Sequence, residues 1–321
     1  MYVHNGFRSK VYNQKNDFFE RNKKMKKIVF IILVFFLQSF FVIGQAIGSW
    51  GFSSKGLPVY QYRGALPFKA IDKSGQDYKM QNDPYFLLGN YRLSLFVHAS
   101  GVYQFMTGER AWARVNANAN KENYGWNDAQ ITIRKGTKQK KINLVGLKSM
   151  ATDAQRTKKL FGVGFAKYAY SLDENLTCER VISVKPSTKI NTGNPSFVES
   201  ITLKNNGKSA KELNYSERMV VNYLPSGIQF FEKGKSPVTY GCKISIDENN
   251  KTAVANVSCA ANKFLALPGK DERYIYDLNP PTIFMSSRSF DKRVSSFAGS
   301  NNDTLSANFS TTLLPGEMRT F

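Results

Sequence analysis

The hydrophobic positions after residue 50 recur with a period of two. In the segment 92–98, Leu93, Leu95 and Val97 fall on one face of an extended chain. Residues 99–101 favour a turn, and the segment 102–106 is again rich in aromatic and apolar residues. The pattern therefore predicts a β-hairpin over 92–106.

A second hairpin is expected around the basic stretch 135–141. Ile131 and Ile133 alternate with polar residues before this stretch, and Ile142 and Leu144 do so after it. The basic residues would then lie at the exposed tip of the hairpin.

Four later segments show the same alternation and are bordered by turn-forming residues. They are 197–203, 213–223, 244–257 and 307–313. The Asn206-Gly207 pair after the first of these is expected to turn with positive φ, and the Pro315-Gly316 pair should end the last strand.

Helical patterning is scarce along the chain. The segment 149–159 is the only candidate helix, and it fits a loop equally well. Many strands with frequent turns predict an all-β fold, a large antiparallel β-sandwich with few helices. No Pro/Ser-rich linker divides residues 45–321, and Asn279-Pro280-Pro281 is interpreted as a loop, so one sandwich domain is expected.

A targeting segment is predicted near the amino end. Residues 28–43 form a 16-residue apolar run that follows a lysine-rich stretch, which is typical of a secretory signal peptide. We expect the signal peptide to span residues 25–44, with cleavage after Gly44, and residues 1–24 to be an over-extended start. A membrane anchor is the alternative, but a span needs about 20 residues. The protein is therefore expected in the periplasm or outside the cell.

The chain is strongly basic, with 45 Lys+Arg against 24 Asp+Glu, a net charge of +21. Residues 1–44 hold eight basic and two acidic residues, so residues 45–321 carry 37 − 22 = +15 over 277 residues. Such a charge invites a nucleic-acid partner. However, the sequence contains no recognition helix, zinc finger or RNP-like aromatic motif. We expect no nucleic-acid partner and interpret the basic surface as solvated.

Histidine and cysteine are rare. The two histidines are His4 and His98, and the three cysteines are Cys178, Cys242 and Cys259. So few ligands cannot form a His-rich metal centre or a CxxC zinc site. Neither a P-loop nor a GxSxG elbow occurs. We therefore expect no cofactor and no metal.

A disulfide is one fate for two of the cysteines in an exported protein. Cys242 and Cys259 flank the predicted hairpin 244–257, and their pairing would close a 17-residue separation, worth about 3 kcal/mol. Cys178 would then remain a buried thiol. In a compartment poor in disulfides, all three are small core residues.

The segment 83–126 mixes aromatic rings with amide, guanidinium and carboxylate groups. Rings of this kind stack on sugars, and the polar groups hydrogen-bond hydroxyls. The predicted carbohydrate-binding residues are Asn90, Arg92, Glu109, Trp112, Arg114, Tyr124 and Trp126. The alternative is that about half of the aromatic residues fill the core and that Glu109 pairs locally with Arg110.

Three motifs in this region carry a family resemblance: Tyr85-Phe-Leu-Leu-Gly-Asn-Tyr-Arg-Leu-Ser-Leu-Phe96, Ser100-Gly-Val-Tyr103 and Gly108-Glu-Arg-Ala-Trp-Ala-Arg114. They resemble the amino-terminal domain of cellobiose-phosphorylase-like enzymes, the glycoside hydrolase family 94 and 36-like group formerly called glycosyltransferase family 36. The resemblance covers roughly residues 50–321. It implies a β-supersandwich that works with an (α/α)6 helical-barrel catalytic domain.

No helix-rich region follows the predicted sandwich, so the family's catalytic residues have no counterpart here. The first hypothesis is a non-catalytic scaffolding and carbohydrate-binding sandwich of an exported carbohydrate-active enzyme, with an oligo- or polysaccharide and the helical barrel as partners. The second is a stand-alone exported glycan-binding or adhesion module. The third is a complete sandwich glycosidase with two carboxylates, although spacing singles out no pair. A homodimer is left open.

Overall fold

The computed structural model describes residues 47–64, 66, 85–107, 113–118, 125–187, 189, 193–224, 238–247, 249, 252–261, 279–287 and 303–321. From Gly48 onward they belong to one unit, Gly48–Phe321. Every strand pairing in it is antiparallel. The all-β class is therefore confirmed for the part of the chain that is described.

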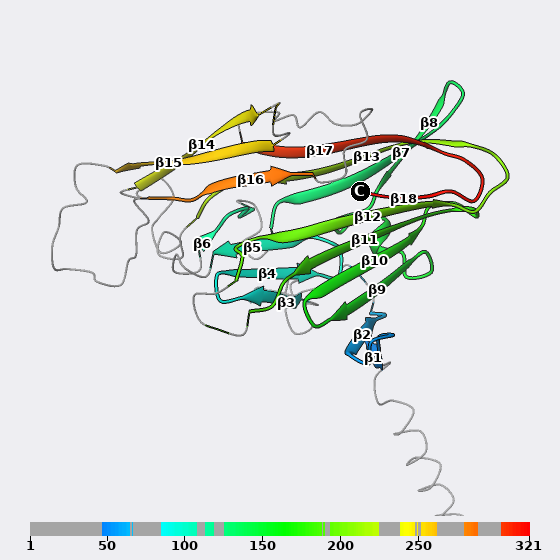
Figure 1. The fold of residues 1–321 in the computed structure, drawn as a ribbon, viewed down its shortest axis with the longest axis horizontal. Helices are drawn as coiled ribbons and strands as arrows, with labels where there is room; N and C mark the ends of the chain where they lie inside the picture. Colours follow the sequence, from blue (N-terminus) through cyan, green and yellow to red (C-terminus); the bar gives the residue numbers. More distant parts are fainter. Residues whose placement is uncertain are drawn as a thin grey trace, which may run out of the picture. The chain divides into compact units, whose positions relative to one another are not determined.

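The strands form four sheets (Figure 1). The largest, in spatial order, contains β1 (Gly48–Phe52), β2 (Pro58–Tyr62), β9 (Thr157–Gly162), β10 (Phe165–Ser171), β11 (Leu176–Val184), β12 (Phe197–Asn205) and β18 (Met318–Thr320). The second contains β17 (Thr304–Leu313), β13 (Lys211–Val220), β7 (Asn127–Lys135) and β8 (Lys138–Asn143). The third contains β3 (Tyr85–Asn90), β4 (Leu93–His98), β5 (Tyr103–Thr107) and β6 (Ala113–Arg114), and the fourth contains β14 (Val238–Asp247), β15 (Thr252–Ala261) and β16 (Thr282–Ser286).

Two layers enclose the core. Along β11 every second residue is buried, and along β13 the same holds from Leu213 to Met219. The sheet of β17, β13, β7 and β8 lies over the sheet of β9 to β12 (Figure 1), and rings such as Phe309 and Phe321 stack between them at 5.0 Å. Period-two burial on facing sheets is the arrangement of a β-sandwich.

The sheet of β3 to β6 packs on the same core. The Phe86 ring of β3 stacks on Phe161 of β9, with centroids 3.6 Å apart. Phe197 of β12 meets the rings of Tyr103 and Phe105 edge-on. This sheet therefore shares the inner face of the seven-stranded sheet.

The alternating patterns predict most strands correctly. The hairpins β4–β5, β7–β8 and β14–β15 form where they are expected. Leu93, Leu95 and Val97 are all fully buried on one face of β4. The long strands β12, β13 and β17 are confirmed too.

The turn after β12 differs from the expectation. It carries the chain from one layer to the other, since β12 pairs with β11 and β18 whereas β13 pairs with β7 and β17. Gly207 does not adopt positive φ. Instead, the Asn205 amide builds the turn, accepting from the Gly207 N–H and donating to the carbonyls of Ser209 and Leu313. Hydrogen bonds of the Asn205 side chain thus stabilise this turn, and Gly207 does not need the left-handed conformation.

The candidate helix over residues 149–159 does not form. Only a single 3-10 turn, Met150–Thr152, forms there, capped by the Ser149 hydroxyl. β9 begins at Thr157, because Thr157, Lys159 and Phe161 alternate toward the core. A segment with only a short helical pattern forms a strand when its inward-facing residues can pack in a sheet.

The three cysteines are free thiols. Cys242 lies opposite Val257, and Cys259 opposite Tyr240, so the two cysteines are diagonal neighbours on β14 and β15. Diagonal positions are about 7–8 Å apart, whereas a disulfide needs Cα atoms about 4.4–6.8 Å apart. The predicted disulfide is not formed, because the strand register places Cys259 opposite Tyr240 and not opposite Cys242.

The predicted signal peptide, residues 25–44, and the possible over-extended start lie outside the described residues. Among those described, no helix is long and apolar enough to cross a membrane.

Candidate functional site

Of the predicted carbohydrate-binding residues, Glu109, Trp112 and Tyr124 lie outside the described residues, while Asn90, Arg92, Arg114 and Trp126 lie within them. Asn90 is committed to the fold. Its amide donates to the carbonyls of Lys185 and Asn194 and accepts from the N–H groups of Arg92 and Leu93. All four of its hydrogen-bonding capacities are used, so Asn90 shapes the β3–β4 turn.

Asn90 and Arg114 belong to opposite faces of one sheet. Asn90 belongs to the row that continues through Leu93 to Thr107 and Ala113, whereas Arg114 pairs with Met106 in the next row. Because successive rows point to opposite faces, the two side chains do not line one surface. The predicted site is therefore not assembled as a single cluster by its described members.

Trp126 is the most exposed of the four described residues, with 39% of its surface accessible. Its backbone is held between Asn116 and Val220. The Asn116 amide accepts from the Phe105 N–H and donates to the Tyr103 carbonyl. These hydrogen bonds hold Asn116, and through it Trp126, against β5.

Gly125 makes that close approach possible. A Cβ at this position would lie 1.6 Å from the Tyr103 carbonyl oxygen. We expect Gly125→Ala to lower the free energy of unfolding by about 1–3 kcal/mol, the range for overpacking, measured by urea denaturation. Gly51→Ala is the matched control, since nothing lies within 4 Å of its added Cβ; equal stabilities of the two variants would contradict this account.

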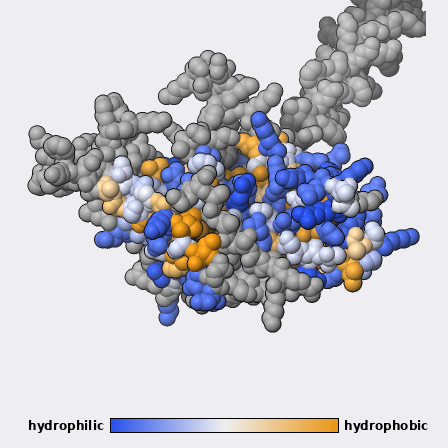
Figure 2. All heavy atoms as spheres, turned by 90° about the horizontal axis from the view of Figure 1, so that it is seen from above, coloured by the Kyte–Doolittle hydropathy of each residue, from blue (hydrophilic) through white to orange (hydrophobic). Residues whose placement is uncertain are grey.

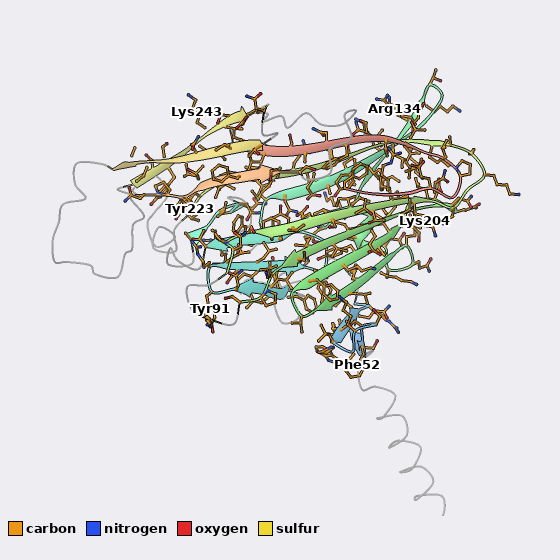
Figure 3. All side chains as sticks on the ribbon, in the orientation of Figure 1. Phe52, Tyr91, Arg134, Lys204, Tyr223 and Lys243 are labelled. Atoms are coloured by element: carbon orange, nitrogen blue, oxygen red, sulfur yellow. The ribbon has the colours of Figure 1, made fainter. Side chains whose placement is uncertain are left out.

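A different aromatic surface is exposed on the β1–β2 hairpin. Trp50 and Phe52 are 74% and 80% accessible, and Trp50 lies opposite Tyr60 with ring centroids 5.2 Å apart. We call Trp50, Phe52 and Tyr60 the aromatic platform. Phe52 lies well apart from Tyr91 at the β3–β4 turn (Figure 3).

The platform is exposed because β1 is the edge strand of the seven-stranded sheet. By register it continues the face on which Tyr62 and Phe161 are buried. Its inner end is fixed on the core, since the Tyr60 ring lies 5.8 Å from that of Phe86. Sequence reasoning missed this surface, although the alternation of Trp50 with Phe52 was its signal.

Two carboxylates converge inside the sandwich. Arg180 of β11 is fully buried and donates through Nη2 to Glu217 Oε1 at 2.8 Å and to Glu199 Oε1 at 3.1 Å. Its Nε also donates to Glu217 and its Nη1 to the Gly101 carbonyl. We call Arg180, Glu199 and Glu217 the buried triad. Tyr215 donates to Glu217 at 2.5 Å.

Burial dominates the electrostatics of the triad. It raises the pKa of Glu199 to about 8, with Arg180 opposing and the charge of Glu217 adding to the shift. Burial therefore favours the neutral form of Glu199 at pH 7. The side chains of Glu199 and Glu217 are only 14% and 6% exposed.

The triad does not fit a glycosidase. Retaining and inverting enzymes hold their carboxyl groups about 5 Å or more apart, with a sugar or water between them. Here both carboxylates contact the same guanidinium nitrogen, so no sugar fits between them. The triad instead joins the two layers and the β4–β5 turn.

His98 also serves the fold. It is fully buried, its Nδ1 lies 2.7 Å from the Ser100 hydroxyl, and its carbonyl accepts from Tyr168. Within the described ranges, no group of three or more His, Cys, Asp or Glu side chains is placed to hold a metal ion.

Comparison with known proteins assigns no family to this architecture. No protein-family model matches the chain, and no curated protein is detectably similar to it.

Proposed function

We propose that the chain is the non-catalytic, glycan-binding and scaffolding β-sandwich of an exported carbohydrate-active enzyme, of the supersandwich type that the motifs of residues 85–114 resemble. Its partners would be an oligo- or polysaccharide and a helical-barrel catalytic domain. The observation that supports binding best is the aromatic platform. Exposed rings on a rigid sheet edge offer flat apolar faces, on which the C–H faces of sugars stack.

Two observations favour a non-catalytic role over the third hypothesis. The convergent acids Glu199 and Glu217 are almost fully buried, and both are engaged by Arg180. A stand-alone adhesion module would use the same platform, so the two binding hypotheses share their first test.

The test is calorimetric titration of the chain with a panel of neutral oligosaccharides, comparing wild type with Trp50→Ala and Phe52→Ala. Each substitution is expected to weaken binding about two- to twelvefold, because an aromatic contact is worth about 0.5–1.5 kcal/mol. Phe284→Ala is the matched control, since Phe284 is 67% exposed on β16, in another sheet.

Binding that is the same in Trp50→Ala, Phe52→Ala and wild type would remove the platform from the proposal. Unaided hydrolysis of aryl glycosides by the chain would overturn the non-catalytic role and restore the glycosidase hypothesis.

A further inference from the structure

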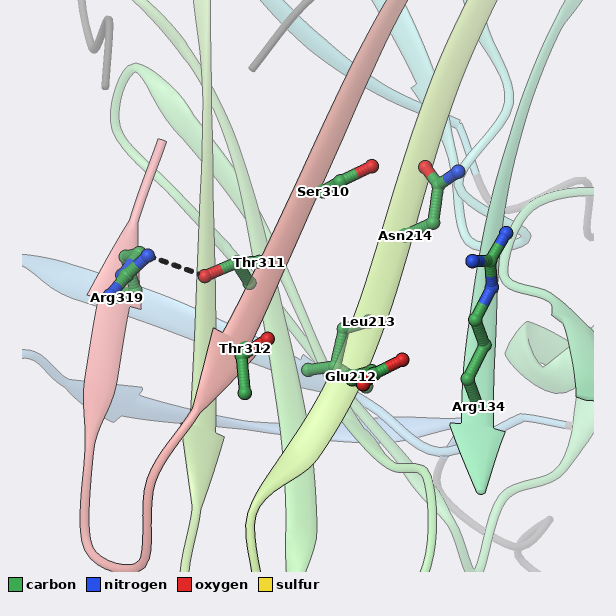
Figure 4. A pocket seen from close by; sticks show the side chains of 8 residues that line it. All are labelled: Arg134, Glu212, Leu213, Asn214, Ser310, Thr311, Thr312 and Arg319. Atoms are coloured by element: carbon green, nitrogen blue, oxygen red, sulfur yellow. Dashed lines mark hydrogen bonds between the residues drawn. The ribbon is translucent and has the colours of Figure 1, made fainter. Parts of the chain in front are cut away.

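A polar pocket opens on the outer face of the sheet formed by β17, β13, β7 and β8 (Figure 4). Its cavity volume is about 300 Å³. The residues that line it are Arg134, Glu212, Leu213, Asn214, Ser310, Thr311, Thr312 and Arg319. We call this the polar pocket. Its residue Arg319 lies on β18, at the opposite edge of the seven-stranded sheet from β1 and the aromatic platform.

Strand register assembles the pocket. Glu212 of β13 lies between Arg134 of β7 and Thr312 of β17, and one row further Asn214 lies beside Ser310. In Figure 4 the Ser310 hydroxyl and the Asn214 amide point toward each other, and Glu212 points toward the β7 side. Three neighbouring strands thus present a guanidinium, a carboxylate, an amide and hydroxyls on one face.

The pocket side chains are uncommitted. Arg134, Glu212, Ser310 and Thr312 form no side-chain hydrogen bond or ion pair with any residue that the structure describes. Asn214 Oδ1 is buried and has no donor. Arg319 differs, since it donates to Thr311 and Glu317. A buried acceptor without a donor, beside free donors, calls for an explanation, and a polar ligand or ordered water supplies one.

Positive charge extends from the pocket along the β7–β8 hairpin. Lys138, Lys140 and Lys141 are exposed on β8, and no ion pair links them or Arg134 to another described residue. Figure 2 shows mostly hydrophilic side chains over the end of this face where β7 and β8 lie. Glu212 is the only acid among the described residues that line the pocket, so the local potential favours an anion.

We infer that the polar pocket and the β7–β8 hairpin bind an anionic glycan, with a uronate residue as the ligand class. This inference rests on the proposed function and names its substrate class. The planar carboxylate of the uronate fits the guanidinium of Arg134, while Glu212, Asn214, Ser310 and Thr312 pair with the ring hydroxyls. A further carboxylate along the glycan would face Lys141, which by register lies on the same face of the sheet as Arg134.

Nucleic acid fits the same charge less well. Binding of single strands relies on aromatic side chains on which bases stack, and no aromatic residue is among the described residues that line the pocket.

The experiment compares tetragalacturonate with cellotetraose, a neutral glycan of equal length, by calorimetry at low and high salt. We expect tighter binding of the uronate, and a fall in that binding with salt. Arg134→Gln should weaken uronate binding about tenfold and leave cellotetraose unchanged. Arg218→Gln is the matched control, because Arg218 lies in the same sheet but is already paired with Asp128 at 2.9 Å.

Equal affinities for the two glycans, or no effect of Arg134→Gln, would overturn the inference while leaving the proposed function intact. Conversely, uronate binding that depends on Arg134 but not on Trp50 would support the pocket and remove the platform. A sulfated tetrasaccharide that binds as tightly as the uronate would widen the ligand to anionic glycans in general. Duplex DNA that competes at equal charge concentration would show unspecific polyanion binding and overturn the inference.

Discussion

Replacing Arg180 with methionine is expected to lower the free energy of unfolding by about 3–5 kcal/mol, the cost of breaking a buried ion pair from one side. The substitution keeps much of the side-chain volume. It removes the guanidinium, which donates hydrogen bonds to Glu199, Glu217 and the Gly101 carbonyl. Glu217 would then lose the guanidinium while staying almost fully buried, and would keep the hydrogen bond from Tyr215.

Urea denaturation, followed by far-UV circular dichroism, measures this effect. Arg218→Met is the control, because its pair with Asp128 is about half exposed and should contribute less than about 1 kcal/mol. The double variant Arg180→Met/Glu217→Leu should recover part of the loss, since the stranded charge is gone. A loss in Arg180→Met no larger than in Arg218→Met would show that the triad does not hold the layers together.

The triad illustrates what alternation along a chain can and cannot predict. Glu217 falls in phase with Leu213, Tyr215 and Met219, so the pattern that predicts β13 already places it inside. Arg180 falls in phase with its apolar neighbours on β11 in the same way. A charge in the inward phase of a strand signals a buried partner. Which charge it meets depends on the order of the sheets, which joins strands that are distant in sequence.

The aromatic platform shows the opposite difficulty. Trp50 and Phe52 alternate as core residues do, and only the position of β1 at a sheet edge leaves them exposed. The polar pocket is equally invisible in the sequence, because Arg134, Glu212 and Ser310 come from three strands that register alone aligns. Local pattern predicts the strands; long-range pairing decides which surface each one presents.

The stability of the protein should fall as pH rises from about 5 to 8. The pKa of Glu199 is raised from 4.5 to about 8 by burial, so across this range the folded chain keeps a proton that the unfolded chain has lost. Proton linkage then lowers the free energy of unfolding by up to about 1.4 kcal/mol per pH unit. Measured unfolding free energies at pH 5, 6, 7 and 8 report the slope.

Glu199→Gln isolates the contribution of this carboxyl, because glutamine resembles the neutral form and cannot ionise. Its unfolding free energy should change less with pH than that of wild type, and the variant should be the more stable of the two at pH 8. Between about pH 8 and 9 Lys159 acts in the opposite direction, since burial lowers its pKa from 10.5 to about 8 and the unfolded chain then holds the extra proton. Above pH 9 the buried Cys178, whose pKa burial raises from 9.0 to about 12, offsets this gain. Parallel profiles for Glu199→Gln and wild type would mean that Glu199 is ionised in the folded protein and that Arg180 balances two negative charges rather than one.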